Sequence, residues 1–183
     1  MLKFTVLVFG LISVFACLFT LSLAQEAVPL SPSASPSPLE YPLPYPGILP
    51  DHPLFFFKII RDQILLILIT NPVRKVEFQM LLSDKYLNMA VFAAEAQKQK
   101  LTLETSTKSI VYLRKAEKLL FQIPAEKKVE AGNLKHRFEK SLQKHQEVIT
   151  DLINYQQLQT HQDELRQLQQ DLSQIFLEYS RKK

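Results

Sequence analysis

The sequence predicts an all-α protein: an antiparallel helical bundle of four to five helices behind an N-terminal signal or anchor helix and a proline-rich linker. One observation is that helix-breaking residues almost vanish after Pro53, where only Pro72, Pro124 and Gly132 remain. A second is that apolar residues recur at helical spacing there, while the β-branched alternation of strands is missing. At 183 residues, the chain has room for one domain with its own apolar core.

The first residues have the form of an export signal. Lys3 precedes an apolar run over residues 4–23, and the small residues Ser22 and Ala24 stand before Gln25. We therefore expect the remainder to be extracytoplasmic, either secreted or held at the cell surface. The run is longer than the roughly 7 to 15 apolar residues of an ordinary signal and could span a bilayer. Residues 1–24 are thus predicted to be a signal peptide cleaved after Ala24 or a transmembrane anchor.

Cys17 is the only cysteine in the chain. The large Phe15 and the apolar residues after Cys17 argue against lipidation, so we interpret it as a small apolar residue within the signal. With no second cysteine the exported part can form no internal disulfide. Its stability must come from the burial of apolar side chains.

Residues 25–49 are predicted to be a linker. Nine of the eleven prolines lie between Pro29 and Pro53, at first mixed with serines, and such a segment favours extended polyproline conformations. At about 3.1 Å per residue, it could hold a domain up to roughly 75 Å from a membrane. From Glu40 onward, aromatic residues such as Tyr41 and Tyr45 alternate with the prolines, so we expect this end to dock on the folded body. The helical bundle domain is assigned to residues 50–183.

The first helix of the bundle is predicted to run from about Pro53 to Thr70. Asp51 or His52 is the expected N-cap, with Pro53 in the first turn. Residues 64–69 are apolar on every side of the helix, which is typical of a helix that is buried or in contact with lipid. We expect it to be the central helix of the bundle, with a helix lying on a membrane as the alternative.

Two further helices follow on short connections. Asn71 and Pro72 form a cap and a first-turn proline, and the helix after them is predicted to end near Gln99. The next is predicted over about Thr105 to Gln122, closed by Pro124. Helices joined by short connections are expected to lie antiparallel.

The last stretch, residues 125–183, carries two apolar seams with alternating steps of three and four residues. The first contains Phe138, Leu142, His145, Ile149 and Leu152, and the second contains Leu158, His161, Leu165, Leu168, Leu172, Ile175 and Tyr179. Successive steps of three between the seams predict a bend near residues 155–160 that divides two long helices. Glutamines keep the outward face polar and nearly uncharged, so these helices could also pair with another chain.

The segment around Leu49-Pro50-Asp51-His52-Pro53 resembles the opening of a family of exported bacterial helical domains of unknown function. The similarity continues through residues 71–77, 82–87 and 144–148, and covers roughly residues 45–155. It implies a compact bundle behind a signal or anchor. The resemblance supplies no activity, cofactor or catalytic residue.

No catalytic, cofactor-binding or metal-binding site is predicted. The four histidines, His52, His136, His145 and His161, show neither a His-Glu-x-x-His pair nor a Glu-x-x-His repeat. Capping explains Asp51 and His52 better than a metal or acid–base role, and His145 on its seam is read as a hydrogen-bonded polar residue that sets register. The formal net charge of +4, with acids and bases interspersed, argues against nucleic acid as a partner.

Three functions remain open at this stage. The favoured one is a non-enzymatic structural or protein-interaction domain of the bacterial cell envelope, with an unknown protein partner bound through its helical faces. The second is an extracytoplasmic helical protein that binds a metal or small ligand through its histidines. The third is a membrane-surface-associated domain that uses the strongly apolar first helix. An uncleaved N-terminal segment would in every case add a membrane contact.

Overall fold

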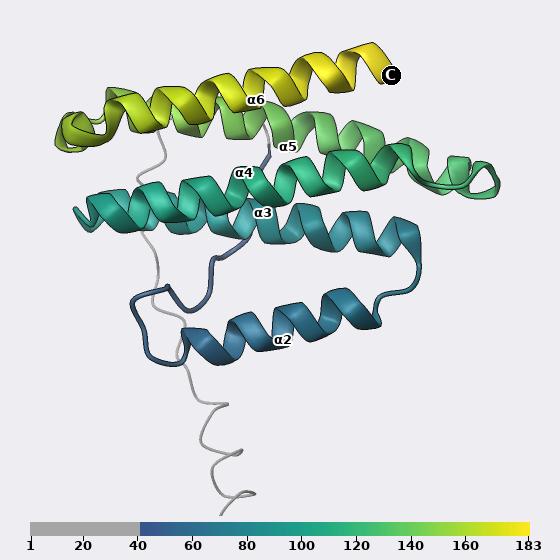
Figure 1. The fold of residues 1–183 in the computed structure, drawn as a ribbon, viewed down its shortest axis with the longest axis horizontal. Coiled ribbons are helices and arrows are strands. Elements are labelled where there is room, and N and C mark those ends of the chain that lie inside the picture. Colours follow the sequence, from purple (N-terminus) through teal and green to yellow (C-terminus); the bar gives the residue numbers. More distant parts are fainter. Residues whose placement is uncertain (1–40) are drawn as a thin grey trace, which may run out of the picture. The chain divides into compact units, whose positions relative to one another are not determined.

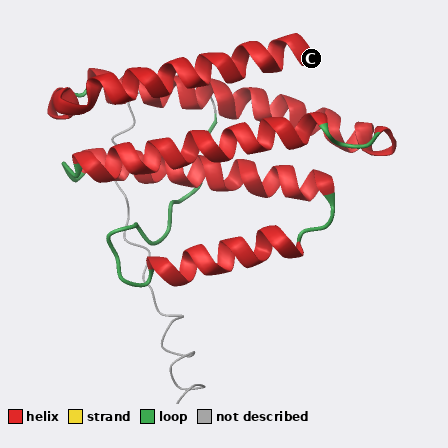
Figure 2. Ribbon diagram, viewed as in Figure 1, coloured by secondary structure: helices red, strands yellow, loops and turns green. Residues whose placement is uncertain are grey.

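The computed structural model describes residues 41–183, which belong to one compact unit that spans residues 38–183. The predicted signal or anchor, Cys17 and the linker up to residue 40 lie outside the described residues. The described part is helical, with no strand among residues 41–183 (Figures 1 and 2). Its elements are α2 (Phe55–Leu68), α3 (Pro72–Glu95), α4 (Gln99–Phe121), the short 3-10 helix η2 (Ala125–Lys127), α5 (Lys128–Asn154), η3 (Gln156–His161) and α6 (Gln162–Lys182).

Helices α3 to α6 form what we call the four-helix body. Helix α3 packs on α4 and α5, and α6 packs on α4 and α5. Consecutive helices run in opposite directions, as short connections require. Helix α2 lies on one side of α3 and α4, and α6 lies on the other (Figure 1).

The main core is built within the four-helix body by apolar residues from all four helices. The two seams predicted near the C-terminus supply much of it: Phe138, Leu142 and Ile149 of α5 and Leu165, Leu172 and Ile175 of α6 are fully buried. The C-terminal helix therefore packs on the bundle. Because the seam has the helical period, folding back turns all of its members toward the core together.

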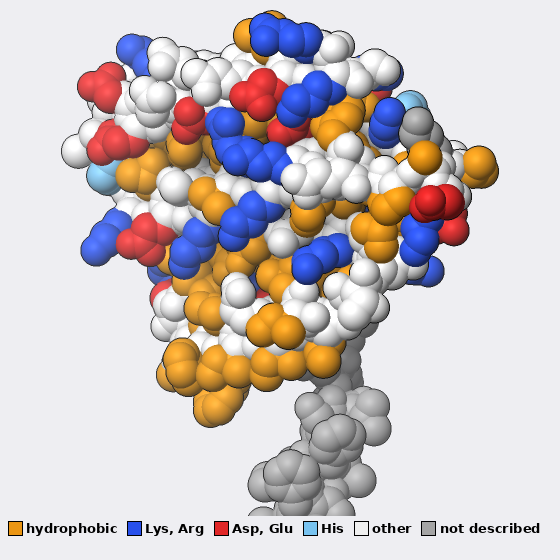
Figure 3. Space-filling view, turned by 45° about the vertical axis from the view of Figure 1, so that its right-hand side comes forward, with side chains coloured by type: hydrophobic (Ala, Val, Ile, Leu, Met, Phe, Trp, Pro, Cys, Tyr) orange, Lys and Arg blue, Asp and Glu red, His pale blue; other side chains and the backbone are white. Residues whose placement is uncertain are grey.

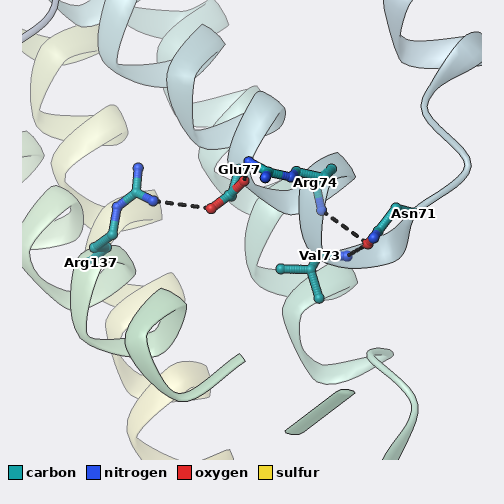
Figure 4. A network of polar contacts seen from close by, with 5 residues as sticks. All are labelled: Asn71, Val73, Arg74, Glu77 and Arg137. Atoms are coloured by element: carbon teal, nitrogen blue, oxygen red, sulfur yellow. Dashed lines mark hydrogen bonds and ion pairs between the residues drawn. The ribbon is translucent and has the colours of Figure 1, made fainter. Parts of the chain in front are cut away.

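The start of α3 follows the predicted capping pattern. The Asn71 side chain accepts hydrogen bonds from the backbone N–H groups of Val73, at 2.9 Å, and Arg74, at 3.4 Å (Figure 4). This satisfies two of the donors that a helix N-terminus leaves free. Farther along, Glu77 bonds both Arg74, at 3.0 Å, and Arg137 of α5, at 3.2 Å, so the capped end is tied to its neighbour (Figure 4).

Two predicted boundaries differ from the structure and one agrees. Helix α3 ends at Glu95, and α4 begins at Gln99, several residues before the predicted Thr105. The connection turns through Gln97, whose positive φ of 59° is the left-handed conformation that usually ends helices at glycine or asparagine. The bend predicted near residues 155–160 is confirmed by η3.

The largest correction concerns α2, which is not the central helix of the bundle. Many of its apolar side chains are exposed, and its N-cap residue is Leu54 without a side-chain cap, in place of Asp51 or His52. A helix that is apolar on all sides offers no polar face to mark its orientation. The position of α2 therefore depends on tertiary contacts, and in the structure it lies at the edge of the bundle (Figure 1).

The end of the linker docks as predicted. The Tyr41 hydroxyl donates to Asp84 Oδ2 at 2.7 Å, and the Asn88 amide donates to the Pro44 carbonyl at 3.0 Å. The Tyr45 ring meets Phe92 edge to face. Residues 41–49 therefore run against α3 before α2 begins.

Candidate interaction surface on helix α2

The most unusual surface among residues 41–183 is the outward apolar face of α2. It comprises Leu54, Phe56, Phe57, Ile60, Ile64, Leu65, Ile67 and Leu68, all classed as exposed. Phe57 is 66% exposed and Ile67 is 79% exposed. Figure 3 shows hydrophobic side chains gathered at the lower edge of the molecule, where α2 lies in Figure 1. Contiguous exposed apolar patches are uncommon on soluble monomers and mark sites of interaction.

The inward face of α2 holds two of the three charges of this helix, Lys58 and Asp62, which an ordinary amphipathic helix would expose. Phe55, Lys58 and Asp62 are buried, one turn apart on the side that faces α3. Phe55 packs with Tyr86 and Met89 in a small second core. The helix is thus inverted: its two buried charges point inward and its aliphatic stripe points outward.

Aromatic rings provide the surroundings of the buried Lys58. Its Nζ lies 5.1 Å from the centre of the Phe55 ring and 5.2 Å from that of Tyr86, which are cation–π distances. No hydrogen-bond acceptor contacts the Nζ. Burial lowers the pKa of Lys58 to about 8; Asp62 opposes this shift, while Lys85 and Arg61 reinforce it.

Basic side chains also lie near the second core beneath α2. Lys108 lies over the Tyr86 ring and Lys115 over the Tyr112 ring, and these two rings stack on each other at 5.4 Å. The single acid of α2, Asp62, is turned inward and paired with Arg61 at 2.8 Å. The second core beneath α2 is therefore accompanied by cations.

A cleft of about 520 Å³ opens where the loop before α2 meets the helix. Its walls carry apolar Ile48, Leu54 and Phe57 and basic Lys58, Arg61 and Lys85, with Gly47 at the turn of the loop. Gly47 has a φ of 75°, a conformation that side-chain-bearing residues rarely adopt. Leu54 and Phe57 belong to the outward face as well, so cleft and face are continuous.

A second polar group lies inside the four-helix body, around His145. Its Nδ1 donates to the Ser141 carbonyl at 2.7 Å, and the Ser83 hydroxyl lies 2.7 Å from Nε2 and 2.8 Å from the Ser109 carbonyl. Burial lowers the pKa of His145, although Asp84 at 3.9 Å opposes the shift. Ser83 and His145 are fully buried. Ser83, Asp84 and His145 thus join helices α3, α4 and α5. His145 is a buried, hydrogen-bonded residue of its seam, as predicted, and its role in setting register stays a prediction.

The adjacent Asp51 and His52 turn to different partners. Asp51 pairs with Lys98, whose hydrogen bond lowers the pKa of that carboxyl, and His52 Nδ1 accepts from the Leu54 N–H at 3.2 Å. The pair thus holds the turn before α2 and links it to the start of α4. Both residues are therefore structural, but the predicted capping is wrong, because neither is the N-cap of α2.

The remaining histidines lie apart from one another. His136 is exposed, and His161 contacts Glu164 at 3.3 Å, the predicted helix pair. Within residues 41–183, no three histidine, cysteine, aspartate or glutamate side chains gather in a way that could hold a metal ion. None of the helices described for this chain is long and apolar enough to cross a membrane.

Lys58, Arg61 and Lys85 were not predicted to lie together, because Lys58 and Arg61 belong to one helix and Lys85 to the next. Their common position depends on how α2 docks on α3. The one signal in the sequence was that α2 concentrates its charges in its first two turns.

Comparison with known protein families, with curated proteins and with solved structures found no match for this chain. The resemblance of residues 45–155 to a family of exported helical domains therefore stays a prediction.

Proposed function

We propose that the chain is a non-enzymatic, extracytoplasmic domain that associates with a membrane surface through the outward apolar face of α2. The observation that carries the proposal is the inverted helix, which exposes Phe57, Ile60, Ile64 and Ile67 while it buries Lys58 and Asp62. A surface-lying helix binds a membrane by sinking its apolar face about 5–10 Å into the boundary of headgroups and acyl chains.

Insertion of the outward face of α2 into lipid would remove from water the apolar side chains that folding leaves exposed, and this transfer is favourable. Full removal of one leucine, isoleucine or phenylalanine side chain from water contributes roughly 1.5–3 kcal/mol. Ile67 and Leu68 are more than half exposed, as are Phe56 and Phe57. Even partial insertion of this set is therefore enough to hold a domain at a surface.

Charge supports a membrane over a protein partner. Lys108 and Lys115 lie over rings of the second core beneath α2, Arg61 is an exposed residue of α2 itself, and the only acid of α2 is turned inward. Anionic lipid headgroups attract such cations at about 1 kcal/mol for each lysine or arginine near the surface. The predicted export segment would deliver the chain to a membrane.

The Gln-rich C-terminal helices offer less support for a protein partner than their sequence suggested. Leu158, Leu165, Leu172 and Ile175, the residues that could have paired with another chain, are buried within this one. Their free faces are mainly polar. We therefore favour α2, in place of the C-terminal helices, as the interaction surface.

The test is flotation with lipid vesicles of residues 25–183, the chain left after cleavage of the export segment, which contains the whole compact unit. We expect it to float with vesicles of phosphatidylcholine and phosphatidylglycerol. The triple variant Phe57→Ser, Ile64→Ser, Ile67→Ser should stay with the soluble fraction.

A matched control removes apolar surface elsewhere: Val111→Ser, Val129→Ser, Leu177→Ser changes three exposed residues on α4, α5 and α6. This variant should float like the parent chain. Equal loss in both variants, or a parent chain that never floats, would overturn the proposal. Sedimentation of the parent chain as a dimer that the α2 triple variant disrupts would instead identify a second copy as the occupant.

A further inference from the structure

The cleft beside α2 is chemically mixed. Its lining combines the apolar side chains of Ile48, Leu54 and Phe57 with the basic side chains of Lys58, Arg61 and Lys85. Since Leu54 and Phe57 also form part of the outward face of α2, a molecule in the cleft would continue onto that face. An anionic group joined to an apolar chain matches both kinds of side chain.

The charges within the cleft are unbalanced. Three basic side chains and no acid are among its lining residues, and the neighbouring Asp62 already accepts from Arg61 at 2.8 Å and 3.1 Å. Lys58 is only 8% exposed, yet no acceptor contacts its Nζ. Burial of an ammonium without an acceptor is costly, and an incoming anion would relieve that cost.

The aromatic contacts of Lys58 do not replace such an anion. The Phe55 and Tyr86 rings lie more than 5 Å from the Nζ. A cation–π contact is worth about 0.5–2 kcal/mol, whereas hydrogen bonding to a charged oxygen also supplies the missing acceptor. The Lys58 ammonium therefore stays buried without an acceptor beside the cleft, and its charge adds to that of Arg61 and Lys85.

We infer that this cleft binds the phosphate group of an anionic phospholipid, with the acyl chains of that lipid lying along Leu54, Phe57 and the outward face of α2. The inference rests on the proposed function, because it supplies a headgroup site for the surface that α2 contacts. The apolar side chains of the lining favour a membrane phospholipid over free phosphate. A lysine pair is suited to phosphate as a set of point charges, and Arg61 can add a fork of donors.

The first experiment uses residues 25–183 and short-chain dihexanoyl phosphatidylglycerol, a soluble phospholipid, in calorimetric titration. We expect saturable binding of one lipid per chain. Inorganic phosphate should bind at least about tenfold more weakly, because it cannot cover the apolar side chains of the lining. If phosphate binds as tightly as the lipid, the cleft is a free-anion site; if the lipid gives no saturable heat, it is no site at all. Either result overturns the inference.

The second experiment compares Lys85→Gln with Lys108→Gln. Both lysines belong to the same side of the body, but only Lys85 lines the cleft, while Lys108 stands outside it over the Tyr86 ring. Lys85→Gln should weaken binding of the short-chain lipid about fivefold, by the typical contribution of one lysine, and Lys108→Gln should change it less than twofold. Equal losses would mean diffuse attraction without a headgroup site.

The two proposals fail in different ways. If the proposed function is wrong, the α2 triple variant will float like the parent chain with every vesicle. If only the headgroup site is wrong, the parent chain will still float in an α2-dependent way, but Lys85→Gln will leave its preference for phosphatidylglycerol over phosphatidylcholine unchanged. Lys58→Met provides a further check, since it should abolish that preference while it leaves the chain folded.

Discussion

Helices α2 and α6 lie on opposite sides of the molecule and use their apolar residues in opposite ways. Helix α6 turns Leu165, Leu172 and Ile175 into the core and keeps glutamines and charges outward. Helix α2 turns Lys58 and Asp62 inward and leaves most of its isoleucines and phenylalanines outside. The apolar residues of α6 build the fold, whereas most of those of α2 remain available for a contact outside the chain.

The difference extends to buried polar groups. Within the four-helix body, His145 has partners on both ring nitrogens, in Ser141 and Ser83. Beneath α2, Lys58 is buried without an acceptor. Gln79, Ser106, Ser109 and Glu117 of the four-helix body also leave a buried oxygen without a hydrogen bond. Lys58 differs from them in that its unsatisfied atom is a charged ammonium nitrogen, which costs more to bury.

The largest expected difference between the two helices is in stability after one aliphatic side chain is shortened in each. Leu172→Ala removes a fully buried residue and should lower the free energy of unfolding by about 2–5 kcal/mol. Ile67→Ala removes a side chain that is 79% exposed and should change it by less than about 0.5 kcal/mol. Urea unfolding of residues 25–183, followed by circular dichroism, measures both.

The test depends on the difference between the two losses in free energy of unfolding, and neither loss is sufficient alone. If Ile67→Ala destabilises the chain as much as Leu172→Ala, the outward face of α2 is covered within the chain itself. The apolar face would then belong to the core and would not be free to meet a membrane.

A smaller effect with the opposite sign is expected at Lys58. Replacing the buried ammonium by methionine removes an unpaired charge and should raise the free energy of unfolding by about 1–2 kcal/mol at pH 7. Lys108→Met makes the same chemical change at an exposed lysine that also lies over the Tyr86 ring, and it should alter stability by less than about 0.5 kcal/mol. The measurement is again urea unfolding.

The pH dependence gives this prediction a second readout. The pKa of Lys58 is about 8 in the folded chain and near its ordinary value of 10.5 when unfolded. Between these values the unfolded chain binds the extra proton, so parent stability rises with pH. The advantage of Lys58→Met should be constant below pH 8 and shrink toward pH 10.5. An advantage that grows with pH would show that Lys58 is not buried as a cation.

Several parts of the fold could be predicted from the sequence because a local signal specified them. The Asn71-Pro72 pair starts α3, the change of phase after Leu152 places the bend, and the α6 seam identifies its buried face. The docking of Tyr41 was also foreseeable, because aromatic residues seldom stay in solvent within a spacer. Each of these rests on neighbours in sequence or on a regular period.

The rest could not be predicted because it depends on tertiary contacts. The apolar residues of α2 are spread around most of the helix, so their spacing does not show which face packs on the body. The sequence pattern therefore could not predict the orientation of α2. The turn at Gln97 lacks the glycine that usually signals a helix end. The cleft combines a loop around Gly47, the start of α2 and Lys85 of α3, and nothing in the sequence links these three.

The central claim, that the outward face of α2 contacts a membrane, is tested most directly by depth labelling. Residues 25–183 contain no cysteine, so Ile67→Cys and Leu177→Cys each introduce one attachment point for an environment-sensitive nitrobenzoxadiazole dye. Both positions are exposed, one on α2 and one on α6. With vesicles that contain phosphatidylglycerol and brominated acyl chains, the dye at position 67 should shift to the blue and be quenched, while the dye at position 177 should be unaffected. Equal responses at both positions, or a dye at position 67 that stays in water, would contradict the account.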